Sequence, residues 1–440
     1  MINILKTVIS AIISLVVFFV NIFYYPPVIT DMPSVPDDFT PVIRFTVASD
    51  CHIKLEGDKK DVEKERVADM ISDSYRLAQS DDTSYKNLDA IVFAGDITDN
   101  GEKEAFVEFK KICDDNIKDE TELMIVLGNH DYYTDIVMAE YNYEKIFGVS
   151  DDFHKTLKGF HFIGVSPSIG GGWYDPLKPM WLSDELEIAE KDNPDYPIFV
   201  IQHMNVKNTI YGSTNWGVAD MTATQSQYPQ IINFSGHSHY PINDPRSVWQ
   251  GSFTAVGTGT LSFFELEVDG VDGYMVENNE YAAQMWVVEA DINGRVRMRA
   301  YDILENTYIG NTYFIEDPTD KSTFAYNHEN MAEKSSAPSF TKSAKLDIVQ
   351  NGDKTTSVTF PQATNKNDDI VFVYRITVKD SQGNTVNSIN HLSGYYFVNQ
   401  PTKHSVNLGK FENGTYTVSV TAENAFSKTS STLTKEFNIN

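Results

Sequence analysis

The sequence predicts an α/β domain with a parallel β-core, followed by a smaller all-β sandwich. Five apolar runs have strand length and are typical of strands buried on both faces of a sheet: residues 42–48, 90–94, 123–127, 198–201 and 231–234. Helical patterns separate the first three runs, and this alternation favours parallel strands joined by crossover helices. The last hundred residues show only short alternating segments with turn signals, which indicates the sandwich.

The individual elements follow from apolar spacing. Apolar residues at i, i+3 and i+4 predict helices at 62–79 and 102–113, and a further helix is expected at 181–190. Alternating residues predict two strands at 284–290 and 296–303, which are separated by a turn at Asn293-Gly294. Strands of the C-terminal domain are expected at 356–360, 370–378 and 414–421.

Composition shifts divide the chain into five parts. We expect a signal anchor or signal peptide at 1–25, a Pro-rich linker at 26–41, the α/β domain at 42–320, a polar linker at 321–342 and the β-sandwich at 343–440. Pro26, Pro27, Pro33, Pro36 and Pro41 make an extended conformation the expected state of the first linker.

The N-terminal segment predicts export. Residues 7–25 carry no charge and are mostly apolar, so a helix formed by them would cover most of a bilayer's hydrocarbon core. Because the residues before Pro26 are bulky, an uncleaved anchor is favoured over a cleaved signal peptide or a buried core helix. The expected location is the extracellular face of the cell membrane, or the medium.

Charge and cysteine content exclude several classes of protein. With 35 Lys and Arg against 62 Asp and Glu, the formal net charge is −27, and such a surface repels nucleic acid. Two cysteines, Cys51 and Cys113, cannot form a disulfide framework or a Cys-rich zinc site. Two buried free thiols are favoured over a Cys51–Cys113 disulfide.

Polar motifs follow each of the five apolar runs. They are Asp50-Cys51-His52, Gly95-Asp96-Ile97-Thr98-Asp99, Gly128-Asn129-His130-Asp131, Gln202-His203 and Gly236-His237-Ser238-His239. Ligands of open α/β sheets bind outside the carboxyl ends of the strands, so these motifs are expected to converge. Carboxylate and imidazole groups suit divalent Mn, Fe or Zn, and two such ions can share a bridging hydroxide and clamp a phosphoryl group. Asp96 is the expected shared ligand. Each motif alone is a weak signal, but their order is specific.

That order resembles the calcineurin-like metallophosphoesterases, over about residues 42–265. The resemblance implies an αββα sandwich of two β-sheets flanked by helices, with two divalent metal ions as cofactors. It assigns one ion to Asp50, His52, Asp96 and His239, and the other to Asp96, Asn129, His203 and His237. It makes His130 the residue that either protonates the leaving oxygen or stabilises the transition state, with Asp99 as the partner that sets its orientation and charge.

Two departures from related families stand out. Purple acid phosphatases have Tyr where this chain has Asp99, so their tyrosinate-to-iron colour is not expected. The C-terminal domain resembles a fibronectin type III module in the stretch 414–422, although in plant members of that branch such a domain precedes the catalytic one.

The expected function is that of an exported, membrane-anchored phosphoesterase that cleaves a phosphodiester or a phosphomonoester by means of a hydroxide bridging two metal ions. Its partners are a phosphate-ester substrate, the membrane through the N-terminal segment and a cell-surface ligand of the C-terminal domain, but not nucleic acid. The alternative is a surface adhesion protein with a vestigial phosphoesterase scaffold. A serine hydrolase is disfavoured, because the stretch 164–168 lacks the second Gly of its motif. The Gly-rich stretch 169–174 is either a substrate lid or an ordinary surface loop.

Overall fold

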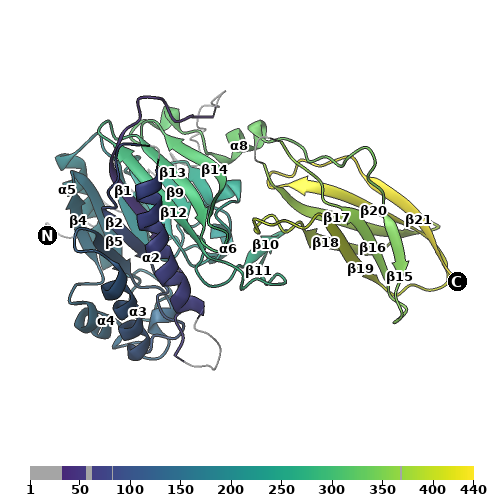
Figure 1. Cartoon of the computed structure of the whole chain (residues 1–440), viewed down its shortest axis with the longest axis horizontal. Coiled ribbons are helices and arrows are strands. Elements are labelled where there is room, and N and C mark those ends of the chain that lie inside the picture. The colour runs from purple at the N-terminus through teal and green to yellow at the C-terminus, as the bar shows by residue number, and fades with distance from the viewer. Residues whose placement is uncertain (1–31, 56–61, 82, 367–368) are drawn as a thin grey trace, which may run out of the picture. The chain divides into compact units, whose positions relative to one another are not determined.

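The computed structural model describes residues 32–55, 62–81, 83–366 and 369–440, which belong to two compact units, 1–330 and 331–440 (Figure 1). The signal anchor or signal peptide expected at 1–25 lies outside the described residues. Within the described ranges, no helix combines the length and the apolar character needed to cross a membrane.

The first sheet of the N-terminal unit contains three of the five predicted strands. The strands β1 (Pro41–Ala48), β2 (Ala90–Ala94) and β3 (Glu122–Val126) are parallel neighbours. Strand β12 (Gln284–Asp291) pairs antiparallel with β1, and β13 (Val296–Asp302) and β14 (Thr307–Ile315) extend the sheet as a meander. The expected parallel core with crossover helices is therefore confirmed for β1 to β3.

The second sheet contains the other two predicted strands. Its order is β4-β5-β6-β7-β9-β8. The strands are β4 (Phe153–Leu157), β5 (Phe160–Val165), β6 (Ile198–Gln202), β7 (Ile231–Ser235), β8 (Val248–Gln250) and β9 (Thr254–Gly257). Strands β5, β6, β7 and β9 are parallel, and the edge strands β4 and β8 are antiparallel to their neighbours. A separate hairpin joins β10 (Leu266–Val268) and β11 (Val271–Tyr274).

The two sheets pack face to face through aromatic side chains. The ring of Phe45 in β1 lies 5.0 Å from Phe162 in β5, 4.7 Å from Phe199 in β6 and 6.0 Å from Phe234 in β7, measured between centroids. All three contacts are close to the edge-to-face geometry that aromatic pairs prefer. These rings form the centre of the interface between the sheets.

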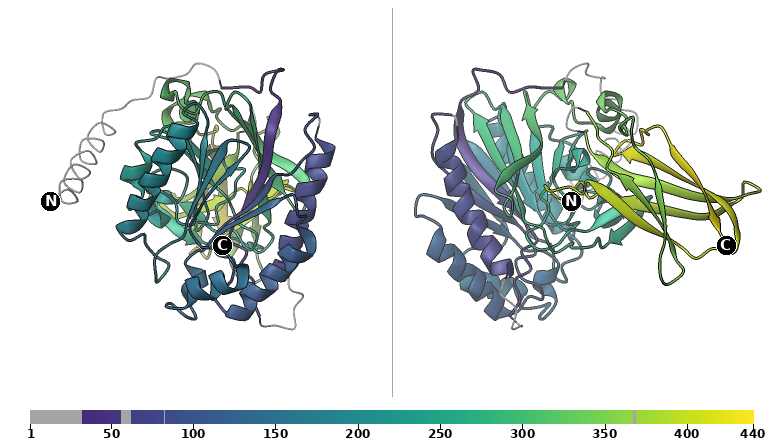
Figure 2. Two further views of the ribbon diagram at one scale, coloured as in Figure 1. Left: turned by 90° about the vertical axis from the view of Figure 1, so that its left-hand side faces the viewer. Right: turned by 45° about the vertical axis from the view of Figure 1, so that its right-hand side comes forward.

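Helices cover both outer faces (Figure 2, left). Helices α2 (Val62–Ser80), α3 (Lys103–Asn116) and α4 (Ala139–Phe147) pack on the first sheet, where their apolar faces form one buried cluster with it. Helix α5 (Leu177–Asp192) packs on the second sheet, and the short helices α6 (Ser213–Trp216) and α7 (Thr222–Gln225) follow β6. Three 3₁₀ turns complete the unit: η1 (His130–Tyr132), η2 (Pro245–Ser247) and η3 (Lys321–Thr323). The layers confirm the expected αββα sandwich. Cys51 and Cys113 are both buried and free.

The C-terminal unit is an all-β sandwich with its own core. One sheet contains β15 (Asp347–Gln350), β16 (Thr356–Pro361) and β19 (Lys403–Gly409); the other contains β18 (Thr385–Leu392), β17 (Val371–Asp380), β20 (Gly414–Asn424) and β21 (Leu433–Ile439). Helix α8 (His328–Lys334) contains the boundary between the units. The hydroxyl of Tyr416, near the start of β20, donates to the carbonyl oxygen of Glu412 at 3.0 Å, which is the tyrosine corner of immunoglobulin-like sandwiches.

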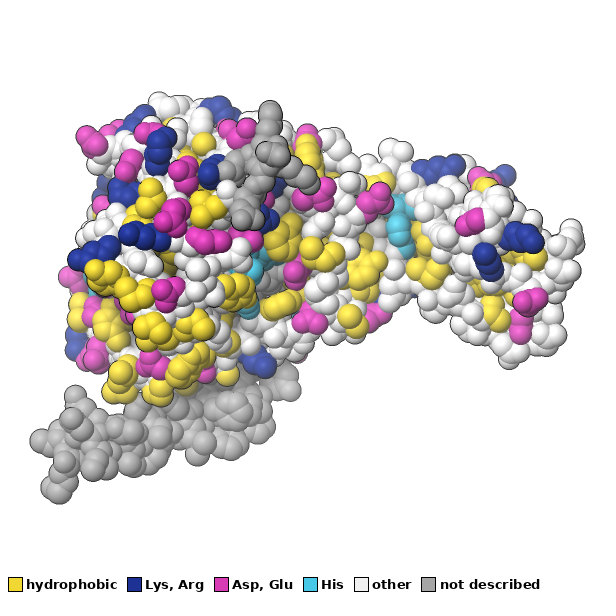
Figure 3. Space-filling view, turned by 90° about the horizontal axis from the view of Figure 1, so that it is seen from below, with side chains coloured by type: hydrophobic (Ala, Val, Ile, Leu, Met, Phe, Trp, Pro, Cys, Tyr) yellow, Lys and Arg dark blue, Asp and Glu magenta, His cyan; other side chains and the backbone are white. Residues whose placement is uncertain are grey.

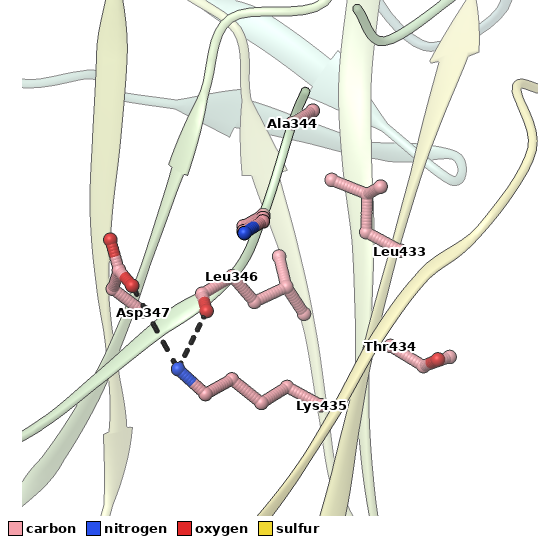
Figure 4. A pocket seen from close by; sticks show the side chains of 7 residues that line it. Ala344, Leu346, Asp347, Leu433, Thr434 and Lys435 are labelled. Carbon is pink, nitrogen blue, oxygen red and sulfur yellow. Dashed lines mark hydrogen bonds and ion pairs between the residues drawn. The ribbon is translucent and has the colours of Figure 1, made fainter. Parts of the chain in front are cut away.

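A small pocket in this sandwich lies where the two sheets meet at β15 and β21 (Figure 4). The Lys435 ammonium, on β21, donates to the carbonyl oxygen of Leu346 at 2.8 Å and lies 3.8 Å from Asp347. Lys435 therefore connects the edge strand of one sheet to the edge strand of the other.

Candidate metal centre

The five predicted motifs meet at the carboxyl ends of strands from both sheets. Backbone hydrogen bonds join the loop after β1 to the loop after β2, because the amides of Asp50 and His52 donate to Gly95 and Asp96 at 3.0 and 3.1 Å. The amide of His237, after β7, donates to the Asp50 carboxylate at 3.2 Å. Loops from the two sheets therefore hold one another in place.

The backbone at these strand ends is strained. Five candidate ligands have left-handed backbone angles, with φ of 54° at Asp50, 48° at His52, 49° at Asp96, 70° at His237 and 56° at His239. Such angles are uncommon for residues with a side chain and cost of order 1–3 kcal/mol each. Strain of this kind concentrates at functional sites, where the surrounding structure enforces it.

The first donor group consists of Asp50, His52, Asp96 and His239. One ligand atom from each lies within 4.8 Å of the others, and all four residues are buried. His239 Nε2 lies 3.0 Å from Asp50 Oδ1 and 3.1 Å from His52 Nε2, and His52 Nε2 lies 3.7 Å from Asp96 Oδ2. Ring nitrogens and carboxylate oxygens thus point at a common centre.

The second donor group shares Asp96 with the first. Asp96, His203 and His237 form a group within 4.8 Å. His203 Nε2 lies 3.2 Å from Asp96 Oδ2 and 3.1 Å from Asn129 Oδ1. The structure therefore brings together all seven residues that the sequence suggested as metal ligands, in the two predicted groups. Their binding of metal stays a prediction.

The outer nitrogens of the imidazoles show that these groups fit a metal ion. His203 Nδ1 lies 2.9 Å from the carbonyl oxygen of Ala94, and His239 Nδ1 lies 3.0 Å from that of Phe263. A carbonyl oxygen can only accept, so each Nδ1 carries a proton, and each Nε2 of the neutral ring has a lone pair that faces the centre. In metal sites, an acceptor at the outer nitrogen of a histidine orients the ring in this way, so that the other nitrogen can bind the ion.

The charges in the centre are strongly coupled. Burial alone would raise the pKa of Asp96, but His203, His52 and His130 outweigh burial and hold it below its ordinary value. Burial opposes a charge on His203 as well, yet the neighbouring Asp96 raises its pKa to about 9. Without metal, Asp96 and His203 therefore form an ion pair, and a bound cation takes the place of the His203 proton.

His130 lies beside both groups, and its contact with Asp99 differs from the expectation in one respect. Its Nδ1 lies 2.8 Å from the backbone carbonyl oxygen of Asp99, whereas the Asp99 carboxylate lies 3.4 Å from His52 Nδ1. The amide of His130 donates to Asp96 Oδ1 at 2.9 Å. Asp99 therefore orients His130 through its main chain, because the turn after β2 directs the carboxylate toward the first donor group.

Asp131 has a role that the sequence did not reveal. Its buried carboxylate accepts from the amides of Thr98 at 2.9 Å, Ile97 at 3.2 Å and Gly128 at 2.9 Å, and from the Thr98 hydroxyl at 2.8 Å. Burial and the nearby Asp96 raise the pKa of Asp131 to about 6. Asp131 joins the loop after β2, which bears Asp96, to the loop after β3, which bears Asn129. The fourth residue of the Gly-Asn-His-Asp motif was the available signal.

Gly128 is required by a close approach. A Cβ atom at this position would overlap the carboxylate and the backbone nitrogen of Asp96. Any side chain there would displace the residue shared by the two donor groups.

Aromatic side chains flank the two groups. The Tyr133 ring lies 4.4 Å from that of His130, the Trp216 ring 5.3 Å from His237, and the Phe263 ring 4.3 Å from His239. Figure 3 shows histidine side chains at the surface of this unit among hydrophobic and acidic side chains. The Gly-rich stretch 169–174 reaches the site at Gly171, where a Cβ atom would come within 2.6 Å of Asn129 Cα.

A comparison with protein families agrees with this geometry. Residues 43–241 match the model of the calcineurin-like phosphoesterase family. A search of the curated proteins found no match. Among solved structures, the chain is similar to a purple acid phosphatase from yellow lupin (Lupinus luteus) seeds, with 13% identity and a TM-score of 0.44 over 63% of this chain and 54% of that one. A second similar structure contains domains A168–A170 of titin, with 14% identity and a TM-score of 0.17 over 37% of this chain and 50% of that one. The chain thus spans about half of the length of these proteins.

All nine residues that the sequence suggested for the site lie within the range matched by the family model. Residues 43–241 therefore resemble a calcineurin-like phosphoesterase domain, and they contain the whole candidate site.

Proposed function

We propose that this enzyme hydrolyses a phosphodiester with the help of two divalent metal ions. Asp50, His52, Asp96 and His239 would hold one ion, and Asp96, Asn129, His203 and His237 the other. The observation that carries the proposal is that the Asp96 carboxylate belongs to both donor groups. Ions of Mn, Fe or Zn bound there would act as Lewis acids on the phosphoryl group and provide the nucleophile.

His130 is the proposed proton donor to the leaving group. Its Nδ1 faces a carbonyl oxygen, which accepts the Nδ1 proton, so Nε2 is the nitrogen able to deliver a proton. The hydrogen bond from its amide to Asp96 fixes the main chain of His130 beside the shared ligand. A protonated leaving oxygen departs as an alcohol, which lowers the barrier to cleavage of the ester bond.

A diester suits the surroundings of the site better than a monoester. A diester carries a second organic group, and Tyr133, Trp216 and Phe263 offer apolar surface for it. Glu265, whose amide lies 3.3 Å from the carbonyl oxygen of His239, adds a carboxylate near the centre. Burial raises the pKa of Glu265 despite the opposing effect of His239. When ionised, this carboxylate repels a dianionic monoester more than a monoanionic diester.

The first test compares two chromogenic substrates. Residues 32–440, a length that keeps the Arg295–Asp38 ion pair of 2.9 Å, would be purified, loaded with Mn²⁺ and assayed with bis(4-nitrophenyl) phosphate and 4-nitrophenyl phosphate. The expected result is faster hydrolysis of the diester, loss of activity in Asp96→Asn, and full activity in Asp114→Asn, an exposed substitution on α3. Faster hydrolysis of the monoester would reject the diester proposal. The absence of both hydrolysis and bound metal would favour the adhesion alternative.

We also propose that the domain acts outside the cytoplasm, anchored through its N-terminal segment. The support is the uncharged apolar stretch of residues 7–25 that follows Lys6. Protease added to intact cells should digest the full chain, and deletion of residues 1–25 should leave the chain in the cytoplasm, protected from that protease. Equal protection of both forms would overturn the proposal.

A further inference from the structure

A second histidine cluster lies on the β4–β5 hairpin, at the opposite end of the second sheet from the metal centre. His161 pairs with Ile198, the first residue of β6, whereas the candidate ligand His203 follows the last residue of that strand. Thr156 and His161 are direct cross-strand partners, and His154 lies two residues before Thr156. Side chains alternate along a strand, so His154, Thr156 and His161 share one face of the hairpin.

Helix α5 adds two carboxylates to this cluster. Glu185 and Asp192 are seven residues apart, which is close to two helical turns, so both lie on one face of α5. His154 Nδ1 lies 2.6 Å from Glu185 Oε2, and His161 Nε2 lies 3.1 Å from Asp192 Oδ2. Each imidazole therefore has a carboxylate on its outer nitrogen.

The inner nitrogens face each other. His154 Nε2 lies 2.8 Å from His161 Nδ1, and the Thr156 hydroxyl lies 3.2 Å from the same His161 atom. A carboxylate accepts the proton of each outer nitrogen, which leaves two lone pairs on the inner nitrogens when both rings are neutral. Two facing lone pairs repel each other, so a cation beside them would stabilise this arrangement.

A metal ion beside the two inner nitrogens meets this need, because a carboxylate at the outer nitrogen is the usual second partner of a metal-bound imidazole. The candidate metal centre of the same chain has a similar pattern, with His52 Nε2 and His239 Nε2 3.1 Å apart and the Asp99 carboxylate 3.4 Å from the outer nitrogen of His52. The histidine pair opens onto a surface hollow that is also lined by Ile188 and Lys191, so an ion can enter from solvent.

We propose that His154 and His161 bind one divalent transition-metal ion of the zinc class, with Glu185 and Asp192 as the partners that orient the two imidazoles. Neutral imidazole suits Zn²⁺, and a carboxylate on the outer nitrogen is its usual second partner. Water or an external ligand completes the coordination, with the Thr156 hydroxyl beside it. This site is separate from the proposed catalytic pair of ions and does not depend on it.

Metal content tests the proposal. The full chain would be equilibrated with Zn²⁺, freed of excess metal and analysed for zinc per chain. The double variant His154→Gln/His161→Gln should hold one zinc fewer than the unaltered chain and should keep its phosphoesterase activity. Glu185→Gln should weaken the affinity of this site for zinc by roughly 10- to 100-fold. An unchanged zinc content in the double variant would overturn the proposal.

The chain provides a matched control in its C-terminal unit. His391 Nε2 and His404 Nδ1 also face each other, at 3.0 Å, but the outer nitrogen of His404 meets the amide oxygen of Gln362 rather than a carboxylate. His391→Gln should therefore leave the zinc content unchanged.

A chemical probe avoids the use of variants. Zn²⁺ should protect His154 and His161 of the unaltered chain from diethyl pyrocarbonate, as read by mass spectrometry of their peptides, whereas Mg²⁺ should not. Equal modification with and without Zn²⁺ would mean that the pair shares only a proton, which would overturn the proposal even if the double variant failed to fold.

Discussion

The ring of His130 is held by the main chain of Asp99: its Nδ1 lies 2.8 Å from the Asp99 carbonyl oxygen, while the Asp99 carboxylate lies 3.4 Å from His52. A main-chain contact survives a change of side chain, so the orientation of His130 is independent of the Asp99 carboxylate. The two residues can therefore be separated by mutation, although the sequence suggested that they act as a pair.

Asp99→Asn and His130→Ala should accordingly have different effects. We expect His130→Ala to keep its metal and to lower kcat by roughly 10²–10⁴, the usual range for loss of a general acid. Asp99→Asn keeps the carbonyl contact with His130 and should lower kcat by less than about tenfold. Its larger effect should be a weaker affinity for the metal ion held by His52. The measurement is kcat together with metal content for both variants. An equal loss of kcat in both, with metal retained, would show that the Asp99 carboxylate acts on His130 after all.

Gly128→Ala should remove activity although it replaces none of the candidate ligands. Its new methyl group would overlap the carboxylate and the backbone nitrogen of Asp96, which both donor groups share. We expect loss of both metal ions and of turnover, measured by metal analysis and a diester assay. Gly172→Ala is the matched control, because no atom lies within 4 Å of a Cβ atom there. A fully active Gly128→Ala enzyme would contradict the structure around Asp96.

Asp131→Asn should loosen the link between the loops after β2 and β3. The carboxylate accepts four hydrogen bonds, and an amide in its place has one oxygen and would turn its NH₂ group toward N–H donors. We expect the free energy of unfolding of the N-terminal unit to fall by about 1–3 kcal/mol, which is the cost of leaving buried donors unpaired. Urea denaturation measures this change. Asp114→Asn, on the surface of α3, should leave the unfolding midpoint unchanged.

The sequence predicted the features that depend on apolar patterning. Strand ends and the polar residues that follow them are local, so the convergence of Asp50, Asp96, Asn129, His203 and His239 could be predicted before the fold was known. The sequence could not predict that Asp99 contacts His130 through its carbonyl oxygen, because this contact depends on the path of the turn after β2. The four hydrogen bonds of Asp131 join two loops, and no local pattern encodes such a contact.

The β4–β5 hairpin shows a second limit. Strand β5 is buried throughout, but β4 is only partly buried at most of its positions, so apolar periodicity is weak in β4. The contact of His154 with His161 depends on the register of this hairpin, and each carboxylate partner lies 31 residues after its histidine, on α5. Tertiary packing, rather than sequence spacing, therefore creates the second cluster.

Removal of residues 343–440 should spare the hydrolysis of small substrates. The C-terminal sandwich has its own core around Val358, Tyr374 and Val418, and all nine candidate site residues lie in the N-terminal unit. We expect kcat/KM for a chromogenic diester to stay within about threefold of the full chain. A large loss in a truncated protein that still unfolds cooperatively would show that the sandwich contributes to the active site.

Asp81 should make the N-terminal unit sensitive to acid. Its buried carboxylate lies 3.2 Å from Arg44, 3.4 Å from Arg297 and 2.5 Å from Arg299. Burial alone would raise the pKa of Asp81, but hydrogen bonds from Thr83 and Arg299 outweigh it and hold the pKa well below its ordinary value. Because the folded chain binds this proton less readily than the unfolded chain, the stabilisation is present above the unfolded pKa of about 3.9 and is lost as the pH falls below it.

Asp81→Asn should therefore lower the free energy of unfolding by about 3 kcal/mol at pH 7, since it leaves buried arginines without their partner. Below pH 4, the variant should lose less stability than the unaltered chain. The urea unfolding midpoints of the unaltered chain and of Asp81→Asn, measured between pH 7 and pH 3, test this difference. If the two midpoints fell in parallel with pH, Asp81 would not be the group that titrates.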